Sequence, residues 1–385
     1  MTKKIITIAA AVVVIAVAVL AISAAFIIVD DEGNRSDFKL TNRSVAVISD
    51  SDDLVNTISS ALSEKTFKIT ISNNLSDAAA RDLVIIDGAW AAAQDDSGIK
   101  NDIKTLIEHN NAVVLLDDSP YYIAESGAAV DYLAFNKNSQ LYGIMNTYAG
   151  QTYYFNADSS YDIGRAVSAA YNWADETIHK ANTLHDLDDV YWDYLGTLRF
   201  GEHCDDRGVI FYEAYYYKLK GEYCDDGHDY YYTHYNLQAA SSNGYYLSQM
   251  RITSNVTSNG LYPNQALYDY TPGAVAKSST ISVKMGATVE YNNINVSIPA
   301  EWEYKESHVA ISDRSLPDQN IMDFVYDITD SDIGSKTVEP GNMVCVDKTD
   351  EEGYHFSEKY SIQFGKTFPG NDLVTYSFCR DLVVT

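Results

Sequence analysis

The sequence predicts a membrane-anchored multidomain chain in which an α/β domain is followed by an all-β, sandwich-like domain. Residues 5–29 contain no charge, Gly or Pro, strand and helix patterns alternate over 41–180, and helical periodicity disappears in 190–385. These three patterns are typical of a transmembrane helix, a Rossmann/flavodoxin-like parallel sheet and an antiparallel sandwich.

The amino-terminal run is long enough to cross a bilayer. At 1.5 Å per residue it reaches about 37 Å, against a hydrocarbon core of about 30 Å. Lysines precede the run and acidic residues follow it, which places the amino terminus in the cytoplasm and the body outside. We therefore expect a single-pass protein of the cell membrane, with residues 1–4 as a cytoplasmic tip and 30–40 as a linker. A signal peptide cleaved near Ala24 is the alternative.

The chain is strongly acidic. It has 54 acidic and 27 basic residues, a formal net charge of −27. Such a surface repels phosphate backbones and anionic lipids, so we expect no nucleic-acid partner.

The four cysteines all lie in the second half of the chain and are compatible with two disulfides in an oxidising compartment. We expect Cys345 to pair with Cys379, and consider a Cys204–Cys224 bond. A straight strand between the latter two would hold them roughly 35 Å apart, too far for a disulfide. A metal site that includes both of them also stays open.

Elements of the first domain follow from hydrophobic periodicity. Continuous apolar runs predict buried strands, and apolar residues at helical spacing predict the helices between them. Ser51 or Asp52 is expected to cap the first helix. The predicted strands are 44–49, 67–71, 83–86, 112–116, 141–145 and 152–155, and the predicted helix faces lie within 54–62, 99–107 and 163–173.

Acidic residues follow several of these strands. Asp50 comes after the first strand, Asp87 after the third, and Asp117 and Asp118 after the fourth. The carboxyl ends of parallel strands meet at one edge, where such sheets bind ligands, and carboxylates suit Ca²⁺ or Mg²⁺. The sequence thus suggests a divalent-cation site. Capping of helices and turns is the alternative role of the same residues.

Two families share parts of this pattern. The acids resemble the edge of a phosphate-accepting receiver domain, with Asp87 as acceptor and Ser119 as the hydroxyl residue, but the expected Lys is missing near 145–147. The segments 82–90 and 99–119 resemble the class I glutamine-amidotransferase-like fold, whose nucleophilic Cys is absent from this domain. The second resemblance implies the fold and not the activity. The alternative function is an exported metal-assisted hydrolase that uses the acidic edge formed by Asp50, Asp87 and Asp117.

The clearest element of the second domain is a hairpin over 281–304. Apolar and polar residues alternate on both sides of Asn292 and Asn293, which gives one apolar and one polar face. With the Tyr-Thr-Pro-Gly sequence at 270–273, this hairpin resembles the stem of leukocidin-type pore-forming toxins. The resemblance implies pore formation, for which each strand needs about 10 residues per crossing.

Tyrosine is abundant, with 31 residues in the chain. Consecutive tyrosines in a strand point to opposite faces, so we expect some of them to be exposed. Tyr216, Tyr217, Tyr231 and Tyr232 are the predicted binding surface for other surface proteins or glycans, with plain β propensity as the alternative. The leading functional prediction is a non-catalytic binding or assembly role at the cell surface.

Overall fold

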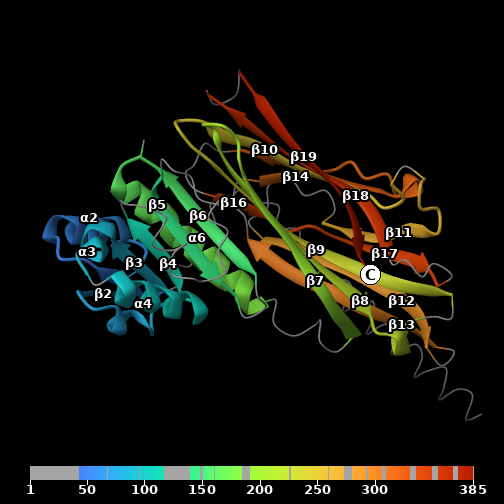
Figure 1. Cartoon of the computed structure of the whole chain (residues 1–385), viewed down its shortest axis with the longest axis horizontal. Coiled ribbons are helices and arrows are strands. Elements are labelled where there is room, and N and C mark those ends of the chain that lie inside the picture. The colour runs from blue at the N-terminus through green and yellow to red at the C-terminus, as the bar shows by residue number, and fades with distance from the viewer. Residues whose placement is uncertain are drawn as a thin grey trace, which may run out of the picture. The chain divides into compact units, whose positions relative to one another are not determined.

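The structure is a computed structural model in which Met1–Leu40 and Thr41–Thr385 are separate units (Figure 1). Only the second unit is described. The division predicted between residues 180 and 190 stays a prediction. The described residues are 43–384 except 67, 95, 117–138, 148–150, 160, 184–190, 225–226, 259, 273–279, 292–293, 306–308, 330–334, 349–353 and 367–371.

The amino-terminal part of this unit contains a six-stranded mixed sheet of order β2-β1-β3-β4-β5-β6. The first four strands in that order are parallel, and β5 and β6 are antiparallel to their neighbours. The strands are β1 (Val45–Ile48), β2 (Ile69–Ser72), β3 (Leu83–Asp87), β4 (Ala112–Leu116), β5 (Ser139–Asn146) and β6 (Thr152–Asp158).

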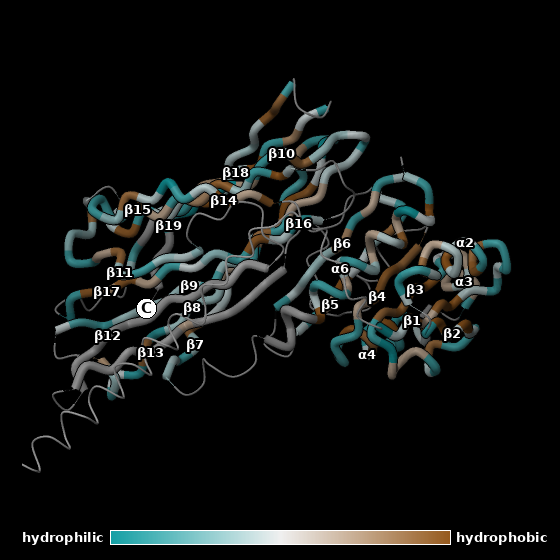
Figure 2. The backbone as a smooth tube through the Cα atoms, turned by 180° about the vertical axis from the view of Figure 1, so that it is seen from behind, coloured by the Kyte–Doolittle hydropathy of each residue, from teal (hydrophilic) through white to brown (hydrophobic). Residues whose placement is uncertain are grey.

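Helices cover both faces of this sheet. Ser51 caps the first of them, since its Oγ accepts a hydrogen bond from the Leu54 amide at 3.3 Å. Helices α2 and α6 pack on one face and α3 and α4 on the other, and Figure 2 shows the hydrophobic residues concentrated in the strands between them. The helices are α2 (Asp52–Leu62), α3 (Gly88–Ala92), α4 (Asp96–Glu108) and α6 (Ile163–Thr183), with a 3-10 turn η1 (Leu75–Ala78).

Two antiparallel sheets follow, of order β14-β15-β10-β18-β19 and β11-β17-β9-β8-β7, and β16 adds to β9. Side chains from both sheets form one hydrophobic core. The strands are β7 (Trp192–His203), β8 (Gly208–Leu219), β9 (His228–Ser241), β10 (Tyr246–Asn255), β11 (Gln265–Thr271), β14 (Val309–Asp313), β15 (Ile321–Ile328), β16 (Ser335–Val338), β17 (Gly341–Asp347), β18 (Tyr354–Gly365) and β19 (Val374–Val384), with 3-10 turns η3 (Gly221–Tyr223) and η4 (Pro317–Gln319).

The predicted amphipathic hairpin is confirmed as β12 (Thr280–Tyr291) and β13 (Ile294–Lys305). Among the described strands these two pair only with each other. The hairpin backbone runs beside α6, β11 and β17. In Figure 1 it lies on the side of the β11–β7 sheet that faces away from β14–β19.

The predicted fold class is wrong and is corrected here to a mostly β-sheet protein with few helices. The Rossmann-like parallel domain is replaced by a mixed sheet, because only residues 147–151 separate β5 from β6. A parallel crossover needs a dozen or more residues, so this short connection enforces an antiparallel pair.

The predicted membrane anchor is corrected with the fold class. No helix within the described residues is both long and apolar enough to cross a bilayer. The run 5–29 itself lies outside the described residues. The predictions of a single-pass architecture and of a cell-membrane localisation are therefore wrong for the described part of the chain.

Close packing of α6 on β5 gives a stability prediction. A Cβ on Gly143 would lie 2.8 Å from the Phe155 Cβ and 3.1 Å from the Trp173 ring. We expect Gly143→Ala to lower the free energy of unfolding by about 1–3 kcal/mol through overpacking, measured by urea denaturation. Gly221→Ala is the control, because nothing lies within 4 Å of that position. Equal stability of the two variants would contradict the packing.

Candidate functional site

Asp87, the buried member of the predicted cation site, acts as a helix cap. Its carboxylate accepts hydrogen bonds from the Ser49 hydroxyl at 2.6 Å and from the Ala89 amide at 3.0 Å, at the start of α3. Asp50 is exposed, while Asp117 and Asp118 lie outside the described residues. Within the described part of the chain, no group of three His, Cys, Asp or Glu residues is placed to hold a metal. The capping role therefore accounts for Asp87.

The four cysteines are free thiols, contrary to the predicted disulfides. Cys204 and Cys224 lie beyond opposite ends of β8, so the whole strand separates them. Cys345 pairs with Tyr230 in one sheet, whereas Cys379 pairs with Lys359 in the other. Burial raises the pKa of the Cys204 thiol to about 12, which disfavours the thiolate that a metal would need.

The predicted tyrosine surface is mostly interior. Tyr216, Tyr231 and Tyr232 are each no more than 6% exposed, and Tyr217 stacks on Tyr232 with ring centroids 4.4 Å apart. The tyrosines do point to both faces of their strands, but both faces are covered. The prediction of an exposed surface is therefore wrong for the three buried residues.

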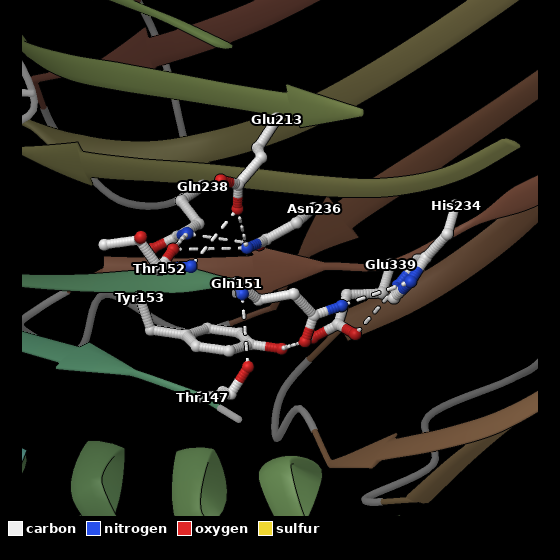
Figure 3. Close-up of polar contacts among 9 residues, drawn as sticks. All are labelled: Thr147, Gln151, Thr152, Tyr153, Glu213, His234, Asn236, Gln238 and Glu339. Atoms are coloured by element: carbon white, nitrogen blue, oxygen red, sulfur yellow. Dashed lines mark hydrogen bonds and ion pairs between the residues drawn. The ribbon is translucent and has the colours of Figure 1, made fainter. Parts of the chain in front are cut away.

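A group of polar side chains lies where β6 meets β8 and β9. The sequence did not predict this group. Strand β6 is the edge of the mixed sheet and pairs only with β5 among the described strands. Its free edge meets polar side chains that project from the face of the β11–β7 sheet, as Figure 3 shows. We call this group the polar seam; it consists of Gln151, Thr152, Tyr153, Glu213, His234, Asn236, Gln238 and Glu339.

In one half of the polar seam, side chains take the place of a neighbouring strand. The Gln238 amide accepts a hydrogen bond from the Tyr154 backbone N–H at 2.7 Å and donates to the Thr152 carbonyl at 2.8 Å. The Asn236 amide donates to the same carbonyl at 3.3 Å, and Glu213 accepts from the Thr152 N–H at 3.3 Å. The Thr152 N–H and carbonyl and the Tyr154 N–H, at the edge of β6, are thereby satisfied without a further strand.

Glu213 is fully buried within this half. Burial raises the pKa of its carboxyl, and the ion pair with Arg199 opposes that rise. The half-exposed guanidinium thus carries the compensating charge that a buried carboxylate requires. Glu213 also accepts a hydrogen bond from the Asn236 amide at 3.1 Å, so its oxygens are occupied by protein groups.

The other half of the polar seam centres on Glu339. Its carboxylate lies 3.2 Å from His234 Nε2 and 3.2 Å from the Tyr153 hydroxyl. The Gln151 Nε2 lies 3.2 Å from His234 Nδ1, and its Oε1 lies 3.1 Å from the Tyr153 hydroxyl. The side chains of Gln151, Tyr153, His234 and Glu339 thus form a closed circle of polar contacts. Burial raises the pKa of Tyr153 well above its ordinary value, so the phenol remains protonated.

A His–Glu pair can transfer protons, but this pair is enclosed. Each residue of the circle is at most 3% exposed, and its polar atoms contact one another. Two concavities in the described part of the chain, of about 680 and 210 Å³, are lined by other residues, around α2 and α6 and around Trp90. The geometry therefore suits the joining of two sheets.

The same sheet face continues into an aromatic region. Tyr217 and Tyr232 point to the side of the polar seam, since they are separated by even numbers of residues from Glu213 and His234. Trp192 packs edge-on against Tyr232 at 4.9 Å. Met343 and Cys345 on β17 belong to this side as well, because Asn342 points the opposite way and donates to Ser254 on β10. Strand β12 runs beside β17, so the hairpin adjoins this aromatic half.

Another buried carboxylate, that of Glu358, lies between the two sheets of the sandwich. Glu358 on β18 accepts hydrogen bonds from the hydroxyls of Tyr212 and Tyr235, the latter at 2.5 Å. Burial raises the pKa of Glu358 to about 7, and the two hydrogen bonds oppose the rise. The carboxylate is thus costly to bury above neutral pH.

Among known proteins, only solved structures match this chain. No protein-family model and no curated protein matches the sequence. A solved structure titled "Pore forming protein" matches with a TM-score of 0.33 and 6% identity, covering 49% of this chain and 95% of that one. A TM-score of this size does not establish a shared fold.

The pKa of Glu358 predicts a pH dependence. The folded-state pKa of about 7 lies above the ordinary 4.5, so the stabilisation from proton uptake is absent above pH 7 and grows as the pH falls towards 4.5. Between pH 8 and 5 the native chain should gain up to about 3 kcal/mol from this group. Chemical denaturation at both pH values measures the gain.

Glu358→Gln should remove this share of the pH dependence. Glu108→Gln, at a half-exposed position on α4, should leave it unchanged. An unaltered pH dependence in Glu358→Gln would contradict a buried carboxylate with a raised pKa.

Proposed function

We propose that this chain is a non-catalytic protein that inserts the hairpin β12–β13 of several copies into a lipid bilayer, as pore-forming proteins do. The register of the hairpin carries the proposal. Along one face, every residue of β12 stands opposite an apolar residue of β13, and along the other face the pairs are polar or include Gly and Pro. The apolar pairs are Ile281–Tyr304, Val283–Trp302, Met285–Ala300, Ala287–Ile298, Val289–Val296 and Tyr291–Ile294.

The way in which the hairpin is held supports its release. Because β12 and β13 pair only with each other among the described strands, moving them away breaks none of the described ladders. The hairpin has to leave its place beside α6, β11 and β17. A bilayer can replace apolar contacts, whereas it cannot replace backbone hydrogen bonds.

Length and backbone chemistry set the form of the inserted state. Each strand has 12 residues, which exceeds the roughly 9–11 needed to cross a bilayer. A single hairpin would leave the outer N–H and C=O groups of both strands unpaired in lipid, at several kcal/mol each. Hairpins from several copies must therefore pair side by side in a closed ring. The proposal concerns the hairpin alone and does not use segment 5–29.

A matched pair of substitutions tests this proposal. Ala287→Lys places a charge on the apolar face, and Thr288→Lys places the same charge at the next position on the polar face. A lysine facing lipid near the bilayer centre costs about 2–4 kcal/mol, so Ala287→Lys should lower dye release from phosphatidylcholine vesicles by at least about 30-fold. Thr288→Lys should release dye as the native chain does.

Circular dichroism and thermal melting establish that both variants fold. Equal dye release by the two folded variants, or no release by the native chain at any concentration at which it binds vesicles, would refute bilayer insertion by this hairpin.

A further inference from the structure

A small concavity lies in the part of the chain that contains the mixed sheet. It has a volume of about 210 Å³ and is lined by residues of neither the polar seam nor the hairpin. We call it the Trp90 concavity. Its lining includes Asn74, Leu75, Trp90, Gln94, Ile99 and Asp102. The mixed sheet thus carries a hollow that the proposed function does not use.

The Trp90 concavity lies at the carboxyl ends of the parallel strands. Asn74 stands two residues after β2, and Trp90 lies on α3, which begins directly after β3. Ile99 and Asp102 lie in the first half of α4, a helix that runs beside η1. Parallel strands bring the segments that follow them to one edge, and open sheets bind their ligands at that edge. The place of the concavity in the fold therefore favours a ligand site.

The floor of the Trp90 concavity is apolar. Leu75, Trp90 and Ile99 are each at most 7% exposed, and they belong to the hydrophobic cluster between the sheet and helices α3 and α4. Packing in this cluster fixes their positions whether or not a ligand is bound. The floor therefore offers a preformed apolar surface, with an indole ring in it, to the C–H groups of a ligand.

The rim of the Trp90 concavity carries both donors and acceptors of hydrogen bonds. The Asn74 side-chain oxygen accepts from the Ser76 N–H at 3.0 Å, so its amide nitrogen is left as the donor. The Gln94 amide nitrogen donates to the Trp90 carbonyl at 3.2 Å, so its side-chain oxygen is left as an acceptor. The exposed Asp102 adds a carboxylate. Contacts with the backbone thus fix the orientation of both amides.

Size and charge narrow the class of ligand. Pockets for drug-sized ligands measure roughly 300–1,000 Å³, so this concavity takes a smaller molecule. Asp102 and the net charge of −27 oppose an anion. A metal cation is not favoured, because Asp102 is the only acidic residue among the described lining residues. An aromatic base needs an open ring face for stacking, whereas Trp90 is only 7% exposed.

A sugar ring matches what the concavity offers. It has an apolar C–H face, and each of its hydroxyl groups can donate one hydrogen bond and accept others. We infer that the Trp90 concavity binds one neutral sugar ring, with its C–H face on the apolar floor and its hydroxyls between the Asn74 donor and the acceptors of Gln94 and Asp102. The inference goes beyond the proposed function, since neither the hairpin nor a bilayer takes part in it.

Saturation-transfer NMR on the full chain tests this inference. The probes are the methyl glycosides of glucose, galactose, mannose and N-acetylglucosamine, presented one at a time. We expect at least one of them to bind with a dissociation constant on the order of 1 mM, as the few atoms of one ring allow. Trp90 belongs to the core, so the test leaves it in place and changes the rim.

Asp102→Ala removes a charged acceptor from the rim and should raise the dissociation constant by at least about tenfold, which corresponds to about 1.4 kcal/mol. Gln94→Ala should also weaken binding. The matched control is Asn101→Ala, which changes the neighbouring exposed position of α4. Asn101 is not among the described lining residues, so this variant should bind as the native chain does. Thermal melting establishes that each variant folds.

Several results would overturn the inference. These are the absence of transfer to all four glycosides, native-like binding by Asp102→Ala, and an equal loss of binding in Asp102→Ala and Asn101→Ala. Adenosine and N-acetylneuraminic acid test the other ligand classes, and tighter binding of either would exclude a neutral sugar as the preferred ligand. Hairpin insertion and sugar binding fail separately, because Asp102→Ala should release vesicle dye as the native chain does.

Discussion

The free edge of β6 is the constraint on which the arrangement of the described unit depends. An edge strand presents unpaired backbone groups, and burying them unpaired costs about 1–3 kcal/mol each. Here β6 is wholly buried, and the Thr152 and Tyr154 backbone groups are satisfied by Glu213, Asn236 and Gln238. Because these side chains belong to β8 and β9, the mixed sheet has to meet the sandwich at this place. Edge-to-edge addition of another strand is blocked by the same contacts.

This constraint divides one sheet face between two tasks. The half that bears Glu213, His234 and Glu339 is tied to β6 and to the adjoining Gln151 by directional hydrogen bonds. The half that bears Trp192 and Tyr232 adjoins a hairpin whose described strands form no ladder with it. Hydrogen bonds fix position, whereas apolar packing is exchangeable for another apolar environment. The half joined by hydrogen bonds therefore holds the two sheets in position. The other half is where the hairpin can move away at the lowest cost in free energy.

The sequence predicted local elements well because their signals are local. Of the predicted helix face Leu54, Ile58 and Leu62, the last two are buried on α2, where Val55 rather than Leu54 completes the buried face. The alternation over 281–304 is the register of β12–β13. The mixed character of the first sheet was missed, although the short gap between the last two predicted strands already excluded a parallel crossover.

The polar seam was missed for a physical reason. On β9, His234, Asn236 and Gln238 alternate with Tyr235 and Leu237, a pattern that normally indicates a solvated face. That the face is covered depends on β6, more than 70 residues away in the chain. The prediction of an exposed tyrosine surface was wrong for the same reason. Side chains on both faces of β8 and β9 were expected from strand geometry, but the layers that cover both faces are set by tertiary contacts.

Release of the hairpin is the central claim, and the native Cys345 can report it directly. Cys345 lies on the sheet face that adjoins the hairpin, Cys379 is exposed, and Cys204 is buried in the core. Single-thiol chains that retain each of these cysteines in turn, with the others replaced by Ala, would be labelled with a maleimide with and without phosphatidylcholine vesicles. We expect the labelling rate of Cys345 to rise at least about tenfold on vesicles, while Cys379 stays fast and Cys204 stays slow. An unchanged Cys345 rate in a chain that releases vesicle dye would contradict departure of the hairpin from this face.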